Sequence, residues 1–466
     1  MVAGDARPVE RPTRRAYAAG RPSEEAKRRP VSTAKTVIVL GADGYIGWPM
    51  AMHLSRLGHK VVAVDNLARR RWDEEGGTES LIPIATMEQR VARWRELTGR
   101  TIIDERIDLC DHEALDACIA RWRPEAVVHF AEQRSAPFSM IDREHAVRTQ
   151  VNNIVGNLNL LFSLRAHVPE CHLIKLGSMG EYGAPNIDIE EGYITIEHNG
   201  RSDRLPYPKV PHSFYHLSKV ADSQNIHFAS RIWGLRATDL NQGVVYGCET
   251  EDTLLHPDLI TRLDYDSIWG TALNRFCVQA ATGNPVTVYG KGGQTRGYLD
   301  IRDTMACITL TLENPPEEGD CRVFNQFTEQ FSLNQLADLV AAARRQHGQD
   351  TTIVHLPNPR VELEEHYYNA KHTRLLDLGL QPHYLGETLV DSLIQLVAQH
   401  THRVDPILLE RPSVDWRTGG NEVWRQYADE GRQGALARAT DALVGATTSV
   451  GGGDGAGTRS EGARVP

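Results

Sequence analysis

One segment near the start of the chain decides the fold: Thr36-Val37-Ile38-Val39-Leu40-Gly41-Ala42-Asp43-Gly44-Tyr45-Ile46-Gly47. The apolar run 36–40 is typical of a buried parallel strand. The apolar spacing that follows (Met50, Met52, Leu54, Leu57) indicates a helix that ends at Gly58. Glycines between a strand and a helix let the backbone approach a pyrophosphate at the helix N-terminus. The segment therefore predicts a dinucleotide site.

The next strand supports that prediction and indicates which dinucleotide binds. Residues 60–64 form a second apolar run, which ends at Asp65-Asn66. A carboxylate at this point can accept hydrogen bonds from both adenosine ribose hydroxyls and would repel a ribose phosphate, which favours NAD over NADP. The alternative is that Asp65 is only a turn residue. We expect an α/β fold: a Rossmann doubly wound parallel sheet with a smaller C-terminal α/β substrate-binding lobe.

A second group of residues predicts alcohol oxidation. Ser178 follows the apolar strand 173–176, and Tyr215 and Lys219 lie four residues apart, so that they share one face of a helix. The Lys219 ammonium would lower the pKa of Tyr215 and make it a base. Ser178 could donate a hydrogen bond to the same substrate oxygen. The alternative is a chance Tyr-x-x-x-Lys pair, because perturbed groups also occur in structural networks.

The order of these motifs resembles the extended short-chain dehydrogenase/reductase family. The glycine spacing in this chain is G-x-x-G-x-x-G, as in that family. Further matches occur at Asp108-Leu109, which we expect to end another strand, at 127–131, at 152–156 and at 241–247. The resemblance implies that Ser178, Tyr215 and Lys219 are catalytic. It also implies a set of cofactor-binding residues: Gly41, Asp43, Gly44, Tyr45, Ile46, Gly47, Asp65, Asn66, Arg69, Asp108, Leu109, Tyr215, Lys219, Gln242 and Val245.

Several strings resemble one branch of that family, the UDP-sulfoquinovose synthases. They are residues 132–137, 178–183, 193–196, 199–201 and 292–303, within a resemblance that covers about residues 35–343. One departure is Ser178, where that branch usually carries Thr. A Ser hydroxyl can make the same hydrogen bond, although its rotamer is freer.

This resemblance implies a redox-neutral reaction on UDP-glucose and sulfite with NAD as cofactor. C4 of glucose is oxidised, water leaves across C5 and C6, sulfite adds to C6, and C4 is reduced again. The implied substrate-binding residues are Arg134, Ser178, Tyr215, Asn241, Gln242 and Arg296. Arg296 is expected on the diphosphate, with Arg302 as a weaker candidate. Arg134 is expected on sulfite, unless it forms an ion pair with an acid such as Glu132.

The group that moves protons at C5 and C6 remains open. NDP-sugar 4,6-dehydratases place an Asp-Glu pair directly after the hydroxyl residue, where this chain has Met179 and Gly180. His216 is one candidate, because an unperturbed histidine titrates near neutral pH. A helical neighbour of Tyr215 points about 100° away, however, and packing is at least as strong an alternative. Glu181 is a second candidate.

Composition excludes several other classes. The net charge of −10 argues against a general nucleic-acid surface, and no apolar run approaches the ~20 residues of a membrane span. Seven cysteines without a C-x-x-C pair suggest neither a disulfide framework nor a metal site. We expect a cytoplasmic protein. The plastid stroma is the alternative if residues 1–35 form a transit peptide.

The expected organisation has four parts. Residues 1–35 are a disordered leader, 36–247 the NAD-binding Rossmann domain with the catalytic residues, 248–435 mainly the sugar-nucleotide lobe with some chain returning to the core, and 436–466 a disordered tail. The long segments 68–105 and 184–213 are expected to be lids above the nicotinamide end.

Three alternatives remain from the sequence alone. A UDP-sugar 4-epimerase would share Asp65, Ser178, Tyr215, Lys219 and Arg296 but would need no sulfite site. A sulfosugar synthase could serve a specialised glycan or metabolite instead of sulfolipid. A catalytically silent sugar-nucleotide binding protein is disfavoured by the intact catalytic set. The family resemblance also implies a homodimer and a glutamate synthase that delivers sulfite.

Overall fold

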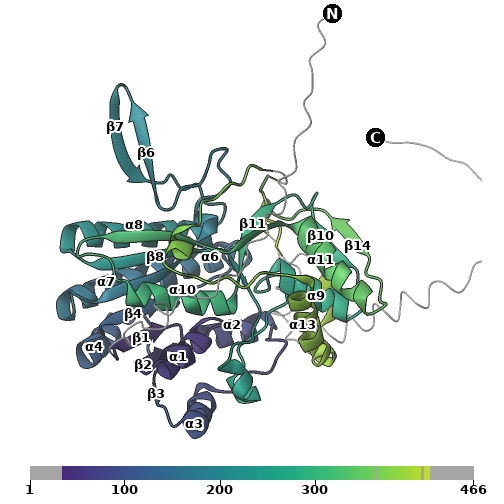
Figure 1. Cartoon of the computed structure of the whole chain (residues 1–466), viewed down its shortest axis with the longest axis horizontal. Helices are drawn as coiled ribbons and strands as arrows, with labels where there is room; N and C mark the ends of the chain where they lie inside the picture. The colour runs from purple at the N-terminus through teal and green to yellow at the C-terminus, as the bar shows by residue number, and fades with distance from the viewer. Residues whose placement is uncertain (1–33, 364–365, 411–413, 420–466) are drawn as a thin grey trace, which may run out of the picture. The chain divides into compact units, whose positions relative to one another are not determined.

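Seven parallel strands form the main sheet, in the order β12-β8-β5-β4-β1-β2-β3 (Figure 1). The structure is a computed structural model that describes residues 34–363, 366–410 and 414–419. The sheet confirms the predicted Rossmann fold. Its strands are β1 Thr36–Leu40, β2 Lys60–Val64, β3 Ile102–Glu105, β4 Ala126–His129, β5 His172–Ser178, β8 Arg236–Gln242 and β12 Cys321–Gln326.

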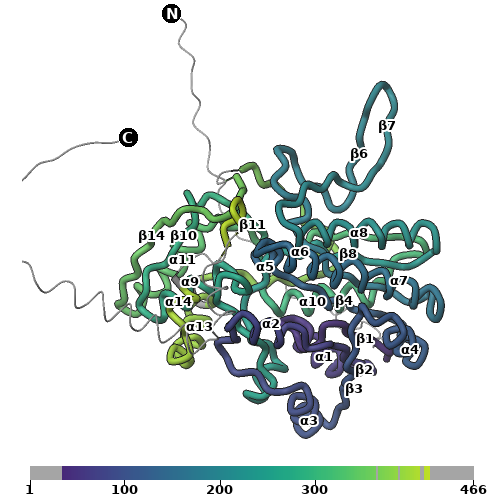
Figure 2. Tube along the Cα trace, turned by 180° about the vertical axis from the view of Figure 1, so that it is seen from behind, coloured from purple at the N-terminus to yellow at the C-terminus, as the bar shows by residue number. Residues whose placement is uncertain are grey.

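Helices cover both faces of this sheet because alternate strand residues point to opposite sides. Val37 and Val39 of β1 pack in one buried cluster with α1 and α10, and Ile38 and Leu40 pack in another with α4, α7 and α8. Figure 2 labels these helices along the chain trace. The helical segments around the sheet are α1 Gly47–Arg56, α2 Ala68–Gly76, α3 Met87–Thr98, α4 His112–Trp122, α5 Ala136–Ser139, α6 Arg143–Gln150, η2 Val151–Val155, α7 Gly156–His167, η3 Met179–Glu181, α8 Phe214–Trp233 and α10 Ile301–Glu313.

Most of the remaining elements build the smaller lobe around a separate apolar core. Its strands are β9 Val244–Tyr246, β10 Val286–Tyr289, β11 Thr295–Asp300, β13 Glu329–Ser332 and β14 Ile353–Leu356. Its helical segments are α9 Ala272–Ala281, α11 Leu333–Gln346, α13 Glu387–Ala398, η6 Thr401–Arg403 and α14 Pro406–Glu410. Three short segments, η4 Thr253–Leu255, η5 Pro257–Leu259 and α12 Arg374–Asp377, complete the described chain; Leu259 and Leu375 pack in the core cluster of the main sheet. Between β11 and β13 the chain returns to the main sheet through α10 and β12, where β12 pairs with β8.

The segment 184–213 forms a hairpin instead of a lid. Strands β6 Tyr193–His198 and β7 Arg201–Pro206 pair antiparallel, and the hairpin projects from the body of the domain (Figure 1). Asn199 and Gly200 both have positive φ, 50° and 73°, as a two-residue Asn-Gly hairpin turn requires. Neither strand lines the pocket described below. The lid prediction for the hairpin strands is therefore wrong.

The segment 68–105 folds onto the glycine-rich loop through Asp43. This buried carboxylate accepts two hydrogen bonds from Arg70, at 2.7 Å each, and lies 3.3 Å from Arg90. Arg70 belongs to α2 and Arg90 to α3, and only 1% of the Arg90 side chain is exposed. The segment therefore braces the loop between β1 and α1, and α2 contributes to the pocket wall.

Some expectations fall elsewhere in the fold. Asp108-Leu109 was predicted to end a strand, but β3 ends at Glu105 and the pair lies in the turn before α4. Residues 1–33 of the predicted leader and the whole predicted tail lie outside the described residues. No helix in the described part of the chain is long and apolar enough to cross a membrane.

The contacts of Asp43 with Arg70 and Arg90 predict that two Asp→Ala substitutions lower the free energy of unfolding by different amounts. Asp43→Ala should lower the free energy of unfolding by about 3–5 kcal/mol, because it leaves the Arg90 guanidinium buried without its carboxylate. Asp111→Ala removes only the N-cap that accepts a hydrogen bond from the Ala114 amide and should cost about 1 kcal/mol. Denaturant unfolding of both variants without added cofactor measures the difference. Equal losses would contradict the brace.

Candidate active site

A cavity opens at the carboxyl ends of β1, β2, β4 and β5. This edge of a doubly wound sheet, where neighbouring crossovers run in opposite directions, is where such folds bind ligands. Most of the predicted cofactor residues line the cavity: Gly41, Asp43, Gly44, Tyr45, Ile46, Gly47, Asp65, Asn66, Arg69, Asp108, Leu109, Tyr215, Lys219 and Gln242. The predicted Val245 is buried in β9 and is not part of the lining.

The loop between β1 and α1 has no room for a side chain at Gly41 or at Gly47. Gly41 has a φ of 80°, and a Cβ there would lie 2.7 Å from the backbone of Phe130 and Ala131 after β4. A Cβ on Gly47 would collide with the backbone of Gly41. The resulting cradle of backbone amides at the N-terminus of α1 fits a dinucleotide pyrophosphate. The Asp43 carboxylate turns away to Arg70 and Arg90, so only the rest of this residue faces the cradle.

Asp65 and Asn66 follow β2 at the predicted ribose position. The Asp65 carboxylate accepts hydrogen bonds from the Asp43 amide at 2.8 Å and the Leu67 amide at 2.6 Å. Burial, and next the Asp43 carboxylate, raise the pKa of Asp65 to about 6. Asn66 donates to Asp108 at 2.8 Å, which places both residues at the same end of the cavity.

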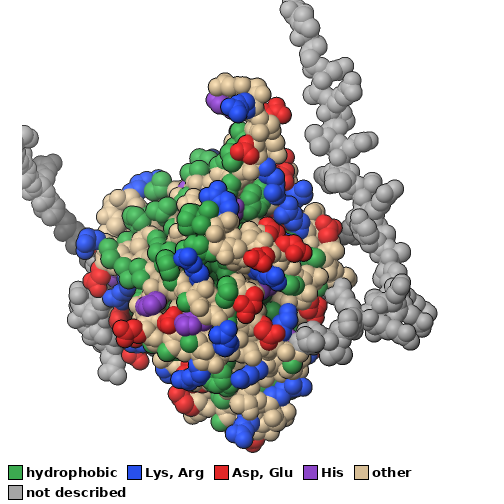
Figure 3. Space-filling model, turned by 90° about the vertical axis from the view of Figure 1, so that its left-hand side faces the viewer, with side chains coloured by type: hydrophobic (Ala, Val, Ile, Leu, Met, Phe, Trp, Pro, Cys, Tyr) green, Lys and Arg blue, Asp and Glu red, His purple; other side chains and the backbone are tan. Residues whose placement is uncertain are grey.

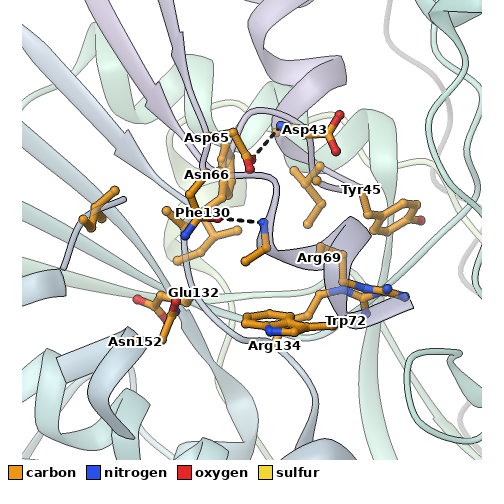
Figure 4. A pocket seen from close by; sticks show the side chains of 18 of the residues that line it. Asp43, Tyr45, Asp65, Asn66, Arg69, Trp72, Phe130, Glu132, Arg134 and Asn152 are labelled. Atoms are coloured by element: carbon orange, nitrogen blue, oxygen red, sulfur yellow. Dashed lines mark hydrogen bonds between the residues drawn. The ribbon is translucent and has the colours of Figure 1, made fainter. Parts of the chain in front are cut away.

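Figure 4 shows that three segments of the chain contribute side chains to the cavity wall. They are Asp65 and Asn66 after β2, Arg69 and Trp72 on α2, and Phe130, Glu132 and Arg134 after β4. Sequence reasoning did not assign several of the lining residues to the site. They are Ala68, Trp72, Ile107, Phe130, Ala131, Glu132, Asn152, Leu176, Gly177, Arg262 and Trp269. Glu132 lies inside a string quoted for the family resemblance, which was the available signal. Trp269 and Arg262 come from the other lobe, and no local pattern marks them.

Tyr215 and Lys219 lie on the first turns of α8 and face the cavity together, as predicted. The Lys219 ammonium donates to the Glu132 carboxylate and to the Leu176 carbonyl. Burial, and next the charge of Glu132, raise the pKa of Tyr215 well above its usual range. The pKa of Tyr215 without cofactor is therefore raised, and not lowered as predicted. The Lys219 ammonium, which was expected to lower it, is paired with the Glu132 carboxylate.

Ser178 ends β5 and caps the short helix η3. Its hydroxyl oxygen accepts from the Gly180 amide at 3.1 Å, and the Glu181 carboxylate accepts from the Ser178 amide at 2.8 Å. The Ser178 hydroxyl keeps its own hydrogen available for donation. Ser178 does not line the cavity, but the preceding Gly177 does.

Glu181, one of the two candidates for the proton transfers at C5 and C6, is held in a buried group of ion pairs. It is fully buried, lies 2.5 Å from the Lys209 ammonium and 3.5 Å from that of Lys175, and accepts from Ser223. Burial alone would raise the pKa of Glu181, but the two lysines outweigh it and hold the pKa below its usual range. An already ionised, fully paired carboxylate is a poor base.

His216 does not line the cavity, but its ring lies beside that of Tyr215. Its ring centroid is 4.8 Å from that of Tyr215, and its Nδ1 is 2.9 Å from the Ser213 hydroxyl. A Cβ on Gly180 would collide with Nε2 of His216, so the imidazole fills the space beside Gly180. Burial lowers the pKa of His216 to about 3, and the ring is neutral at neutral pH.

Arg134 lies in the wall of the cavity, but Glu132 is not its partner. Its guanidinium donates to the Asp264 carboxylate and, at 3.1 Å, to the Trp269 carbonyl, and 37% of the side chain is exposed. Asp264 also pairs with Arg69 and Arg262. Arg69 stacks 3.9 Å above the Trp269 ring. Three arginines thus share a small group of carboxylates at this wall.

The two arginines predicted to bind the diphosphate, Arg296 and Arg302, do not line this cavity, whereas Gln242 of β8 does. Arg296 on β11 pairs with Glu362 at 2.6 Å, and its guanidinium is 3.3 Å from His366. The sequence did not predict that Glu362 pairs with Arg296, or that Arg360 also acts on the Glu362 carboxylate. The weaker candidate Arg302 is paired with Asp300 at 2.8 Å. Asn241 is buried and donates to the Tyr182 hydroxyl at 2.7 Å, and Gln242 donates to Gln326 at 3.1 Å.

No group of three or more His, Cys, Asp or Glu among the described residues could hold a metal ion. All seven cysteines are free, and only Cys110 is not buried.

The family model of the NAD dependent epimerase/dehydratase family matches residues 37–325. The chain is 58% identical to the chloroplastic UDP-sulfoquinovose synthase of Spinacia oleracea, over 84% of this chain and 80% of that protein. It is 43% identical to the UDP-sulfoquinovose synthase of Sulfolobus acidocaldarius, over 74% of this chain and 88% of that protein.

Solved structures share the fold at lower identity. UDP-glucose 4-epimerase of Thermotoga maritima with UDP-glucose superimposes with a TM-score of 0.57 at 22% identity, covering 79% of this chain and 99% of that chain. UDP-glucose 4-epimerase of Thermus thermophilus in complex with NAD superimposes with a TM-score of 0.55 at 23% identity, covering 79% and 100%. Together with the glycine cradle and the Tyr215–Lys219 pair, the sequence matches show that the chain belongs to the NAD-dependent epimerase/dehydratase family.

Proposed function

We propose that the chain is a UDP-sulfoquinovose synthase that converts UDP-glucose and sulfite to UDP-6-sulfoquinovose and water. Support comes from the two relatives of that name, at 58% and 43% identity over most of the chain. The observation that carries the proposal is local. Where 4,6-dehydratases have their Asp-Glu pair, Met179 and Gly180 stand, and the His216 ring occupies the space beside Gly180.

The residues around the cavity fit NAD. The amide cradle at Gly41 and Gly47 suits the pyrophosphate, and Asp65 suits the adenosine ribose. When bound, NAD supplies the hydride acceptor at the start of the cycle and the hydride donor at its end. Tyr215 then accepts the proton of the C4 hydroxyl and later returns it, while the free hydrogen of the Ser178 hydroxyl holds the C4 oxygen.

We assign the proton transfers at C5 and C6 to His216. Its ring is neutral, so Nε2 or Nδ1 can accept a proton, whereas Glu181 is ionised and fully paired. A ketone at C4 acidifies the C5 proton, so a weak base at this position suffices. The same group, once protonated, can assist the departure of the C6 hydroxyl as water.

Arg134 is our candidate for sulfite. It is the most exposed of the three arginines at the Asp264 wall and lines the cavity. Sulfite would compete with Asp264 for this guanidinium.

A glutamate synthase as the sulfite source, a role in sulfolipid formation and a cytoplasmic location are parts of the same proposal. The plastid stroma is the alternative if residues 1–35 act as a transit peptide.

We propose that the protein is a homodimer paired through its helices. Large apolar side chains are 39–55% exposed along α6, η2, α7 and α8: Val147, Val151, Val155, Phe162, Leu217, Phe228 and Ile232. Figure 3 shows hydrophobic side chains gathered on one face of the molecule below the hairpin. An apolar face on neighbouring helices suits an isologous contact with a second copy.

The direct test is incubation of the purified protein with UDP-glucose and sulfite, followed by chromatography and mass analysis of the nucleotide sugar. A sulfonated product supports the proposal. UDP-galactose instead would identify a 4-epimerase, and no turnover with either substrate would identify a binding protein.

Two partial reactions, reduction of bound NAD and deuterium exchange at C5, distinguish the role of His216 from that of Tyr215. His216→Asn should still reduce bound NAD with UDP-glucose, which absorbance near 340 nm follows, but should slow solvent deuterium exchange at C5 by about 10²–10⁴-fold. Tyr215→Phe should slow both processes. Unchanged exchange in His216→Asn would contradict the assignment.

The pKa of Asp65 predicts how NAD affinity depends on pH. The ionised carboxylate accepts the ribose hydroxyls, and its pKa of about 6 means that protons compete with NAD as the pH falls. Affinity should therefore be full above pH 7 and weaken about tenfold by pH 5. Calorimetric titration of NAD across this range measures it. Asp65→Asn should bind more weakly at pH 7 and lose the dependence; a dependence that survives in this variant would point to another group.

A further inference from the structure

Glu132 is a buried carboxylate in the catalytic wall that the proposed reaction does not use. It follows β4, lines the cavity, and exposes 3% of its side chain (Figure 4). One carboxylate oxygen accepts from the Lys219 ammonium. The other oxygen has no hydrogen-bond partner among the described residues and lies 3.6 Å from Nε2 of the buried His129.

The Lys219–Glu132 ion pair changes the electrostatic environment of the Tyr215 phenol. An unpaired Lys219 ammonium would favour the phenolate, but an ammonium in contact with a carboxylate is part of a neutral pair. The charges that act most on Tyr215 come from the segment after β4, from β5 and from η3: Glu132, Arg134, Lys175 and Glu181. The His216 ring lies beside that of Tyr215 on α8. Lys219, Asp222 and His129 interact with Glu132 itself.

The other cations in this set are also balanced. Lys175 lies 3.5 Å from both Glu181 and Asp239, and Arg134 pairs with Asp264. Both oxygens of the Asp222 carboxyl lack hydrogen-bond partners among the described residues, and burial, and next the charge of Glu132, raise the pKa of Asp222. Each described cation that faces Tyr215 thus has a carboxylate beside it.

We propose that Glu132 is a positioning residue that holds Lys219 and cancels its charge, so that Tyr215 stays a neutral phenol unless a further cation enters the cavity. An oxidised nicotinamide ring carries such a charge and a reduced one does not. Tyr215 would accept the C4 proton only beside the oxidised cofactor and would keep it until C4 is reduced again. The inference takes the reaction from the proposed function, but the charge arrangement itself does not depend on the substrate.

The test reads the phenol directly. The full chain is labelled with 3-fluorotyrosine, and ¹⁹F NMR follows the Tyr215 resonance, identified by its loss in Tyr215→Phe, as the pH rises. Without cofactor, Glu132→Gln should lower the Tyr215 midpoint by about one to three pH units relative to the wild type. Glu132→Asp keeps the charge and should stay close to the wild type. Glu113→Gln, on the exposed start of α4, should leave the midpoint unchanged.

Two outcomes would overturn the inference. One is an unchanged midpoint in a folded Glu132→Gln protein. The other uses only the wild type and remains available if that variant does not fold: saturating NAD+ must lower the midpoint and saturating NADH must not, and equal midpoints would refute the proposal. Failure of the proposed function would show differently, as absence of sulfonated product with these titrations unaffected.

Discussion

The close approach of Gly41 to the end of β4 is the constraint on which the site depends. With a Cβ position only 2.7 Å from the backbone of Phe130 and Ala131, the first loop and the β4 segment must share one narrow space. That contact brings the pyrophosphate cradle, Glu132 and Arg134 to one cavity. Because β1 and β4 are neighbours in the sheet, residues far apart in the chain become parts of one site.

Around this cavity the protein places charges in pairs and small clusters. Asp43 is held by Arg70 and Arg90, Lys219 by Glu132, and Arg134 by Asp264. Burying single charges is costly, and a buried charge needs a partner. The consequence for chemistry is that few groups act as isolated charges. The properties of Tyr215 follow from a balance between several neighbours, and a Tyr-x-x-x-Lys spacing alone does not determine its pKa.

The elements that carry strong local signals could be predicted from the sequence. The 36–47 segment, Asp65 and the Tyr215–Lys219 helix took their expected places because each depends on backbone geometry and short-range spacing. Glu132 as the partner of Lys219, and Asp264 as the partner of Arg134, could not be predicted, since both pairings arise from tertiary packing. Val245 does not line the cavity for a similar reason: β9 pairs with β11, and the Val245 side chain is buried in a hydrophobic cluster. Arg360 and Glu362 beside Arg296 lie in a segment without periodic structure.

The return of the chain through β12 has a consequence for how the protein is made. During synthesis, β8 emerges long before Cys321–Gln326, the strand that pairs with it along its whole length from Ala237 to Gln242. Until then β8 is an open edge with unsatisfied amides and carbonyls, the kind of surface that promotes association between chains. The first half of the cofactor domain is therefore complete in sequence well before it is closed in space, and much of the smaller lobe is translated in the interval.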